Sequence, residues 1–252
     1  MTSFPLVSVI TPVFNSARYL PETYESLLAQ SYNNWEWVVT DDCSSDDSWK
    51  ILSDISKSDP RVKVHRNGVN SGAAVSRNVA IDKSVGDFIA FLDSDDYWFP
   101  DKLLRQIEFM GDGIDFSFTA YEIMNDSGQS LGKVVDGNRF AAFGYKDMLL
   151  KSATIGCSTV ILRRSAFSDI SMPLIRTGQD YALWLKLLKT GTCAHLFSRV
   201  LTRYRISPNS ISRNKLKKAK RQWSIYRDLE GLSLLNSVYC FLFYAWRAVF
   251  KA

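Results

Sequence analysis

This sequence contains few histidines and no closely spaced pair of cysteines. His65 and His195 are the only histidines in 252 residues, so a histidine-rich metal site or a histidine-based triad has little support. The cysteines are widely separated and form no CxxC pair: they are Cys43, Cys157, Cys193 and Cys240. A disulfide framework or a zinc site is therefore not expected, and we interpret the thiols as unpaired groups in a reducing cytosol.

Nucleotide-loop and targeting patterns are also missing. No GxGxxG follows a strand, which argues against a dinucleotide dehydrogenase, and no GK[ST] marks a Walker loop. The first fifteen residues have no basic segment before their apolar run, which Pro5 and Pro12 interrupt. They therefore predict a strand rather than a signal peptide.

The composition is that of a globular protein, with 46% apolar and 23% charged residues, but its charge is uneven. Residues 213–252 contain nine Lys and Arg against two acidic residues, whereas residues 1–212 contain 22 against 24. The positive charge thus belongs to the C-terminal tail. This argues against a nucleic-acid groove across the main body and favours an anionic surface as the partner of the tail.

Hydrophobic periodicity alternates between strands and helices over the first ninety residues. Strands are predicted at Val7–Val13, Trp35–Thr40, Val62–His65 and Asp87–Leu92, with helices at Arg18–Ser31, through Ile51 and Ile55, and from Asn70 to Ser84. This alternation predicts an α/β fold, with a mostly parallel, Rossmann-like sheet covered by helices on both faces.

The pattern is less regular after Pro100. Helices are predicted at Asp101–Met110, Tyr145–Lys151 and Gln179–Lys189, and strands at Ile114–Met124, Gly132–Val135, Thr159–Leu162 and His195–Tyr204. We therefore expect a main domain at residues 1–212 and a helical tail at residues 213–252.

The tail divides at Gly231. Arg213–Leu229 is a basic helix, and Leu232–Phe250 is an apolar helix with one polar stripe, which makes it amphipathic. The stripe consists of Ser233, Asn236, Ser237, Cys240, Tyr244, Arg247 and Lys251. Three placements stay open for this helix: in the plane of a membrane surface, packed on the protein's own body, or across a bilayer.

An acidic turn, Asp93-Ser94-Asp95-Asp96, follows the fourth predicted strand. In an open α/β sheet, ligands bind beyond the carboxyl ends of the strands. Three carboxylates in four residues repel one another unless a cation neutralises them. Carboxylates at i and i+2 suit Mg²⁺ or Mn²⁺, which take one or two protein oxygens plus phosphate oxygens. The turn is therefore a candidate metal site, and the alternative is an acidic turn that caps the helix after Pro100.

Three other segments carry candidate chemistry. Thr11–Asn15 and Asp41-Asp42 follow strands and offer groups that read a nucleobase edge or only cap their loops. Asn70–Asn78 begins a helix with small residues, where backbone N–H groups and Arg77 favour an anion unless the segment is simply a packed helix start. Asp180 opens an amphipathic helix and is either a general base or its N-cap.

Together these segments resemble the family 2 glycosyltransferases, which are inverting enzymes of the GT-A fold that build bacterial surface polysaccharides. The matches occur in family order and at family spacing over about residues 5–205. They are Val7–Asn15, Val38–Asp46, Asn70–Gly72 through Arg77 and Asn78, Phe91–Asp96, and Gly178–Tyr181.

The resemblance implies a role for each matching residue. The residues implied to bind the nucleotide-sugar, most naturally a UDP-sugar, are Thr11, Pro12, Val13, Asp42, Arg77, Asp93, Ser94 and Asp95. Among them Arg77 would lie near the pyrophosphate, and Asp95, with Asp93 beside it, would ligate Mn²⁺ or Mg²⁺. Asp180 matches the base that deprotonates the acceptor hydroxyl.

The chain departs from the family pattern at two positions. Gln179 stands where the family usually has Glu, and Ser207 replaces a histidine that is common in the late segment around Arg203–Ser210. The QxxRW pattern of processive synthases is absent as well. The resemblance therefore implies transfer of a single sugar, with inversion.

The basic helix before an amphipathic helix suits an anionic leaflet. We therefore expect a polyprenyl-diphosphate-linked saccharide as acceptor, a peripheral position at the cytoplasmic face of the inner membrane, and no nucleic-acid partner. Two other functions compete. A sugar nucleotidyltransferase needs a Gly-rich triphosphate loop after the first strand, which Thr11–Asn15 is not. A non-catalytic, membrane-recruited nucleotide-sugar binder would tolerate the loss of Asp180.

Overall fold

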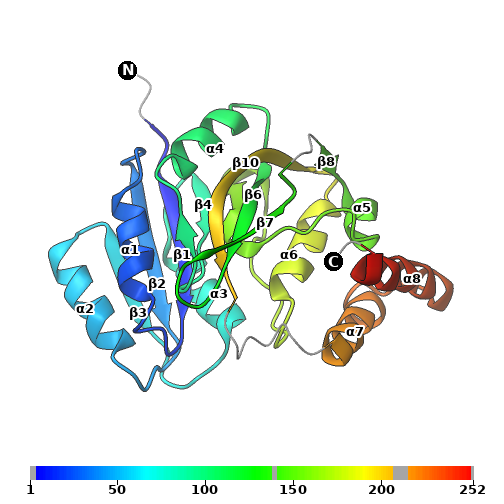
Figure 1. The fold of residues 1–252 in the computed structure, drawn as a ribbon, viewed down its shortest axis with the longest axis horizontal. Helices are drawn as coiled ribbons and strands as arrows, with labels where there is room; N and C mark the ends of the chain where they lie inside the picture. Colours follow the sequence, from blue (N-terminus) through cyan, green and yellow to red (C-terminus); the bar gives the residue numbers. More distant parts are fainter. Residues whose placement is uncertain (1–3, 138–140, 207–214, 251–252) are drawn as a thin grey trace.

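The computed structural model describes residues 4–137, 141–206 and 215–250. The first half alternates as its sequence predicts (Figure 1). Its elements are β1 (Val7–Val13), α1 (Leu20–Leu28), β2 (Trp35–Asp41), α2 (Ser48–Ser58), β3 (Val62–Arg66), α3 (Ala73–Lys83), β4 (Phe88–Phe91), β5 (Tyr97–Trp98) and α4 (Lys102–Met110).

The second half is less regular. Its elements are β6 (Phe116–Met124), β7 (Ser130–Val135), β8 (Ala142–Phe143), α5 (Tyr145–Leu149), β9 (Val160–Arg163), α6 (Gln179–Leu188) and β10 (Ala194–Arg205). The C-terminal elements are α7 (Lys215–Ser224), a π-helical turn (Ile225–Leu229) and α8 (Leu234–Phe250). The two-residue strands β5 and β8 have no periodicity of their own, so the sequence does not reveal them.

The strands of the described residues form one sheet in the order β3-β2-β1-β4-β9-β6-β10-β5, with β7 beside β6 and β8 beside β10. The four strands β1 to β4 are parallel, as predicted. β9 lies antiparallel between β4 and β6, and β10 pairs parallel with β6. The α/β prediction is confirmed, and the sheet is mixed in its second half because β9 enters between two earlier strands.

Helices cover both faces of the sheet. One apolar core lies under α1, α2 and α4 and takes alternate strand residues such as Val9 and Val39. The other lies under α3, α5 and α6 and takes the intervening residues, such as Ile10 and Val38. Successive side chains of a strand point to opposite faces of the sheet. Because β1 and β2 are buried on both faces, they carry apolar residues at odd and at even positions.

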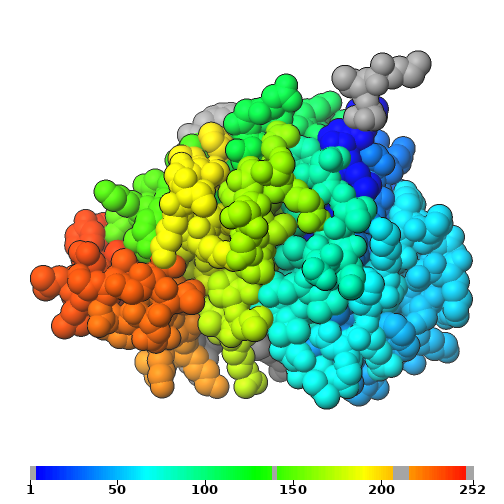
Figure 2. Space-filling model, turned by 180° about the vertical axis from the view of Figure 1, so that it is seen from behind, coloured from blue at the N-terminus to red at the C-terminus, as the bar shows by residue number. Residues whose placement is uncertain are grey.

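The C-terminal elements pack on α5 and α6 rather than standing apart. The Tyr226 hydroxyl donates to the Leu149 carbonyl at 2.6 Å, and Glu230 pairs with Lys189 at 2.7 Å. Ile225 and Cys240 are buried within the core of the main body. The predicted boundary at residue 212 lies outside the described residues, as do Ser207 and Ser210. α7 and α8 form the far end of the molecule in both views (Figures 1 and 2).

α8 is amphipathic, as predicted, and part of its polar stripe faces the protein, whereas Ser233 and Asn236 are exposed. Ser237 and Cys240 are buried, and Arg247 donates to the Lys151 carbonyl at 3.0 Å. The opposite, apolar face is exposed at Leu234, Leu235, Val238, Tyr239 and Leu242. Gly231, with φ at 63°, makes the turn at which the tail divides. No described helix is long and apolar enough to cross a membrane.

Candidate functional site

The sheet order brings three strand ends together. β1 lies between β2 and β4, with Val13 level with Asp41 and Ile10 level with Phe91. The Asp42 amide donates to the Val13 carbonyl at 2.7 Å, and the Leu92 amide to the Ile10 carbonyl at 3.1 Å. The predicted nucleotide-binding segments therefore meet at the carboxyl edge of the parallel half of the sheet, where such folds bind ligands.

The end of β1 forms the floor of this edge. Thr11, Pro12 and Val13 are all buried, and the Thr11 hydroxyl accepts a hydrogen bond from the Trp37 indole at 2.8 Å. The exposed side chain that follows them is Phe14. The predicted donor contacts at Thr11–Val13 would accordingly run through backbone atoms.

Asp42 closes the loop that leads into α3. Its carboxylate accepts hydrogen bonds from the backbone amides of Ser71 and Gly72, at 2.8 and 2.7 Å, and from the Asn67 side chain at 2.7 Å. These two amides thus bind a carboxylate of the protein itself and are not free for a phosphate. The start of α3, with residues 174–176, lines a cleft of about 430 Å³.

Arg77 pairs with one acidic group and interacts through charge with a second. It is 5% exposed and forms an ion pair with Asp93. Burial alone would lower the pKa of Arg77, but the ion pair with Asp93 outweighs it and raises that pKa, and the charge of Asp180 adds a smaller effect in the same direction. The guanidinium is therefore a fixed positive charge beside the acidic turn. The sequence predicted each residue separately, and the fold places them together.

The remaining carboxylates of the acidic turn differ in environment. Burial and the neighbouring Asp93 raise the pKa of Asp95 to about 6. Asp96 is fully buried and accepts hydrogen bonds from the Ser158 hydroxyl at 2.5 Å and the Arg205 amide at 2.9 Å. The Ser158 hydroxyl also accepts from the Asp93 amide at 3.0 Å. Asp96, which the sequence left unassigned, therefore holds the turn in shape and leaves Asp95 to face a ligand.

A divalent cation fits these residues. One oxygen of Asp93 pairs with Arg77, and the carboxyl of Asp95 has a pKa raised by burial and by Asp93. The protein therefore offers two acidic groups to a metal ion. Within residues 4–137, 141–206 and 215–250 there is no group of three or more His, Cys, Asp or Glu that would hold a metal unaided. Mg²⁺ and Mn²⁺ accept one or two carboxylates when a substrate phosphate supplies further oxygens. The site therefore suits a cation that binds together with a diphosphate.

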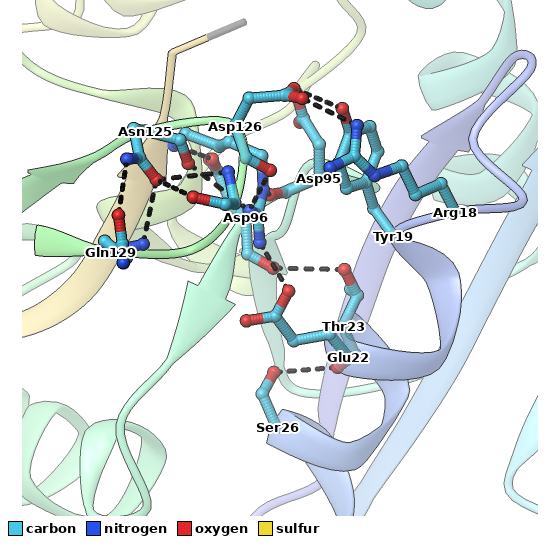
Figure 3. Close-up of polar contacts among 12 residues, drawn as sticks. Arg18, Tyr19, Glu22, Thr23, Ser26, Asp95, Asp96, Asn125, Asp126 and Gln129 are labelled. Atoms are coloured by element: carbon cyan, nitrogen blue, oxygen red, sulfur yellow. Dashed lines mark hydrogen bonds and ion pairs between the residues drawn. The ribbon is translucent and has the colours of Figure 1, made fainter.

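A polar network formed by α1, the loop after β6 and the end of β10 also supports the acidic turn (Figure 3). Arg205 donates to the Asp95 carbonyl at 2.7 Å, to the Asp126 carbonyl at 2.9 Å and to the Glu22 carboxylate at 2.5 Å. The Tyr19 hydroxyl donates to the Asp126 carboxylate at 2.5 Å. The resemblance placed Arg205 only in the late segment around Arg203–Ser210, and the sequence does not predict this supporting role. Its partners are more than 75 residues away along the chain, so no local pattern reveals them.

Asp180 lies in the first turn of α6. The N-cap is Gly178, at φ 78°, so the alternative that Asp180 is the N-cap is wrong. Asp180 is half-buried, and the groups on which its charge acts are Arg77, Lys151 and Cys157. A carboxylate at this position is stabilised by the helix dipole and remains available to take a proton.

Comparison with known proteins matches this arrangement to one family. The family model described as Glycosyl transferase family 2 matches residues 8–171. TuaG of Bacillus subtilis (strain 168), named as a teichuronic acid biosynthesis glycosyltransferase, is 45% identical over 98% of this chain and 97% of its own length. WfgD of Escherichia coli, named UDP-Glc:alpha-D-GlcNAc-diphosphoundecaprenol beta-1,3-glucosyltransferase, is 40% identical over 88% of this chain and 86% of its own length.

A solved structure shows the same fold. The mannosyltransferase PcManGT from Pyrobaculum calidifontis, in complex with GDP-Man and Mn²⁺, superimposes with a TM-score of 0.72. The match covers 99% of this chain and 71% of that one, at 16% identity. The likeness concerns the fold alone, and it confirms the predicted GT-A arrangement.

Proposed function

The chain belongs to glycosyl transferase family 2, and we propose that it transfers one hexose from a UDP-sugar to a hydroxyl of a polyprenyl-diphosphate-linked saccharide in polysaccharide synthesis. One observation carries the proposal: buried Arg77 forms an ion pair with Asp93 of the acidic turn and lies close enough to Asp180, at the start of α6, for their charges to interact. A diphosphate site and a candidate base therefore share one cluster. The activity for which WfgD is named supports the UDP-sugar and the lipid-linked acceptor.

The donor half of the site binds a metal ion and the charged diphosphate of the donor. Asp95, with Asp93 beside it, would hold Mn²⁺ or Mg²⁺, which supplies Lewis-acid stabilisation of a diphosphate leaving group. Arg77 keeps a fixed positive charge beside Asp93 whether or not a ligand is bound. Ser158 and Arg205 hold the turn rigid through Asp96, so these groups need little rearrangement during the reaction.

The acceptor half of the site moves a proton. The anomeric carbon becomes oxocarbenium-like as the bond to the diphosphate breaks. Asp180 takes the proton of the attacking hydroxyl, whose oxygen forms the new glycosidic bond on the opposite face of the sugar. This in-line displacement inverts the anomeric centre, so that an α-linked donor gives a β-glycoside. The absence of QxxRW favours release after one transfer.

Product analysis tests the proposal. Incubation with UDP-glucose, Mn²⁺ and GlcNAc linked through diphosphate to a short polyprenyl chain is expected to give one added hexose, identified as β-linked by the anomeric proton coupling in NMR. UDP-glucose without acceptor serves as the control for hydrolysis. An α-linked product would refute inversion, and the absence of transfer from every UDP-hexose would refute the donor class.

The exposed face of α8 supports a peripheral membrane position. Leu235, Val238, Tyr239 and Leu242 lie at helical spacing on that face, and exposed Lys220 lies on the preceding helix α7. An apolar stripe beside basic side chains suits the interface of an anionic leaflet. We therefore place the chain at the cytoplasmic face of the inner membrane, with α8 in the plane of the bilayer and bound to the protein by its polar stripe.

Replacing both Leu235 and Leu242 by Ser is expected to weaken binding to phosphatidylglycerol vesicles about tenfold or more, because these side chains are 83% and 62% exposed and would enter the interface. Co-sedimentation measures the change. Leu131→Ser, at a leucine on β7 that is 55% exposed, is the matched control. Equal loss of binding in the control, or no loss in the double variant, would contradict the membrane position.

A further inference from the structure

A group of basic side chains lies behind Asp180, where the end of α5, the start of α6 and helix α7 meet. A Cβ added to Gly178 would lie 3.1 Å from both Cδ and Nε of Arg221, so the Arg221 side chain lies against the N-cap of α6. On the α5 side, the Lys151 ammonium lies 3.0 Å from the centre of the Tyr181 ring. Asp180 lies between Gly178, the N-cap of α6, and Tyr181, the two residues that make these contacts.

These cations are not balanced by acidic groups. Burial lowers the pKa of Lys151 well below its ordinary value, Asp180 partly opposes the shift and Arg221 adds to it. Burial and Arg221 also lower the pKa of Lys218, one turn before Arg221 on α7. Asp180 is the acidic group whose charge acts on Lys151, and its charge also acts on Arg77. The cluster therefore favours an additional anion, which would oppose the lowering of the Lys151 pKa.

Two buried hydrogen-bond donors of the described residues in the same region have no partner. They are Nε of Arg221 and Nε of Arg247. Buried donors are rarely left without a partner, and their accumulation here points to an acceptor-rich ligand.

The position of the cluster matches the geometry of the acceptor. In a sugar attached through a diphosphate to a lipid, the attacking hydroxyl and the diphosphate are substituents of the same sugar ring. Asp180 faces the hydroxyl in the proposed function, so the diphosphate belongs within about the width of one ring. The start of α6 adds its dipole, and α8, whose apolar face is exposed, contacts the same region through Arg247.

We propose that Lys151, Arg221 and Lys218 form a subsite for the diphosphate of the lipid-linked acceptor. The inference rests on the proposed function and deepens it, because it places the acceptor as well as the donor. Arg247 is a positioning residue in this arrangement: it donates to the Lys151 carbonyl and to the Ser152 hydroxyl, at 3.0 and 3.4 Å, and so ties α8 to the subsite.

A comparison of two acceptors tests the subsite. GlcNAc is attached to the same short polyprenyl chain either through a diphosphate or as a neutral glycoside, and kcat/KM is measured for each in detergent. Arg221→Gln is expected to lower kcat/KM for the diphosphate acceptor about tenfold or more, mostly through KM. The value for the neutral acceptor and the KM for the UDP-sugar stay within twofold. Arg221→Lys restores part of the loss, and Lys50→Gln, which removes an exposed charge from α2, behaves as wild type.

Each other outcome overturns the subsite. Equal losses with both acceptors would make Arg221 structural, and a raised KM for the UDP-sugar would assign the cluster to the donor. If Arg221→Gln weakens binding to phosphatidylglycerol vesicles but leaves the diphosphate acceptor unaffected, the cations serve lipid headgroups instead.

A binding measurement keeps the subsite testable if the wild-type protein transfers no sugar, an outcome that refutes the proposed function separately. Titration of farnesyl diphosphate, followed by calorimetry, is expected to give at least tenfold weaker binding to Arg221→Gln than to wild type. Equal affinities would overturn the subsite.

Discussion

Replacing Asp180 by Asn is expected to lower kcat about a thousandfold while the affinity for the UDP-sugar stays within twofold of wild type. The substitution keeps the size of the side chain and removes its ability to take the proton of the acceptor hydroxyl. Donor binding is preserved because no hydrogen bond or ion pair among the described residues joins Asp180 to the acidic turn, although its charge acts on Arg77. Steady-state transfer rates and calorimetric titration of the donor measure the two quantities.

Asp112→Asn is the matched control for this experiment, since Asp112 is an exposed carboxylate in the turn before β6. Its kcat is expected to equal that of wild type. If Asp180→Asn retained full activity, the chain would be a nucleotide-sugar binder or would use another base. If Asp180→Asn lost donor binding as well, the N-terminal turn of α6 would belong to the donor site.

Replacing Asp95 by Asn is expected to lower kcat/KM a hundredfold or more and, at the same time, to stabilise the ligand-free protein. The loss of activity follows from the loss of the carboxylate best placed to ligate the cation. The gain in stability follows from the pKa of Asp95, which burial and Asp93 raise from 3.8 to about 6. At pH 7 the folded protein must keep this group ionised against both effects, at a cost of about 1–3 kcal/mol.

The pH dependence has a definite sign. Because the folded protein holds the Asp95 proton more tightly than the unfolded chain does, the free energy of unfolding falls as the pH rises from about 4 to about 6. Asp95→Asn should flatten this part of the profile, which urea denaturation at a series of pH values measures. Mn²⁺ should raise the melting temperature of the wild type at pH 7, and chelation should reverse it. The same response to Mn²⁺ in Asp95→Asn would remove Asp95 from the metal site.

Local sequence was sufficient for the half of the site that lies on the parallel strands. Val7–Val13, Trp35–Asp41 and Phe88–Phe91 are short runs of apolar residues separated by helical patterns, and such runs determine a parallel sheet almost unaided. Asp42 and Asp93 follow the ends of β2 and β4, which flank β1 in the parallel half of the sheet, so both lie at the same edge. Local sequence therefore places the acidic turn at this edge.

The partners of the acidic turn required the tertiary structure. Ser158 lies 62 residues from Asp96, and Arg205 lies 110 residues from Asp95. They reach the turn because β9 inserts between β4 and β6 and because β10 closes on β6. Neither pairing has a periodic signal, since it depends on contacts between distant segments rather than on local backbone preference.

The tail shows the same division. Its sequence by itself determined a basic helix, a break at Gly231 and an amphipathic helix, because helical periodicity and a positive φ are local properties. Which face of α8 turns inward was decided only by the fold. Arg247 finds its partner on the body of the protein, at the Lys151 carbonyl, and a buried polar group without a partner is costly, so this part of the polar stripe faces inward and Leu235 and Leu242 face outward. Likewise the sequence determined that Asp180 begins a helix, whereas only the packing of α3, α5 and α7 around that helix placed Arg77, Lys151 and Arg221 beside it.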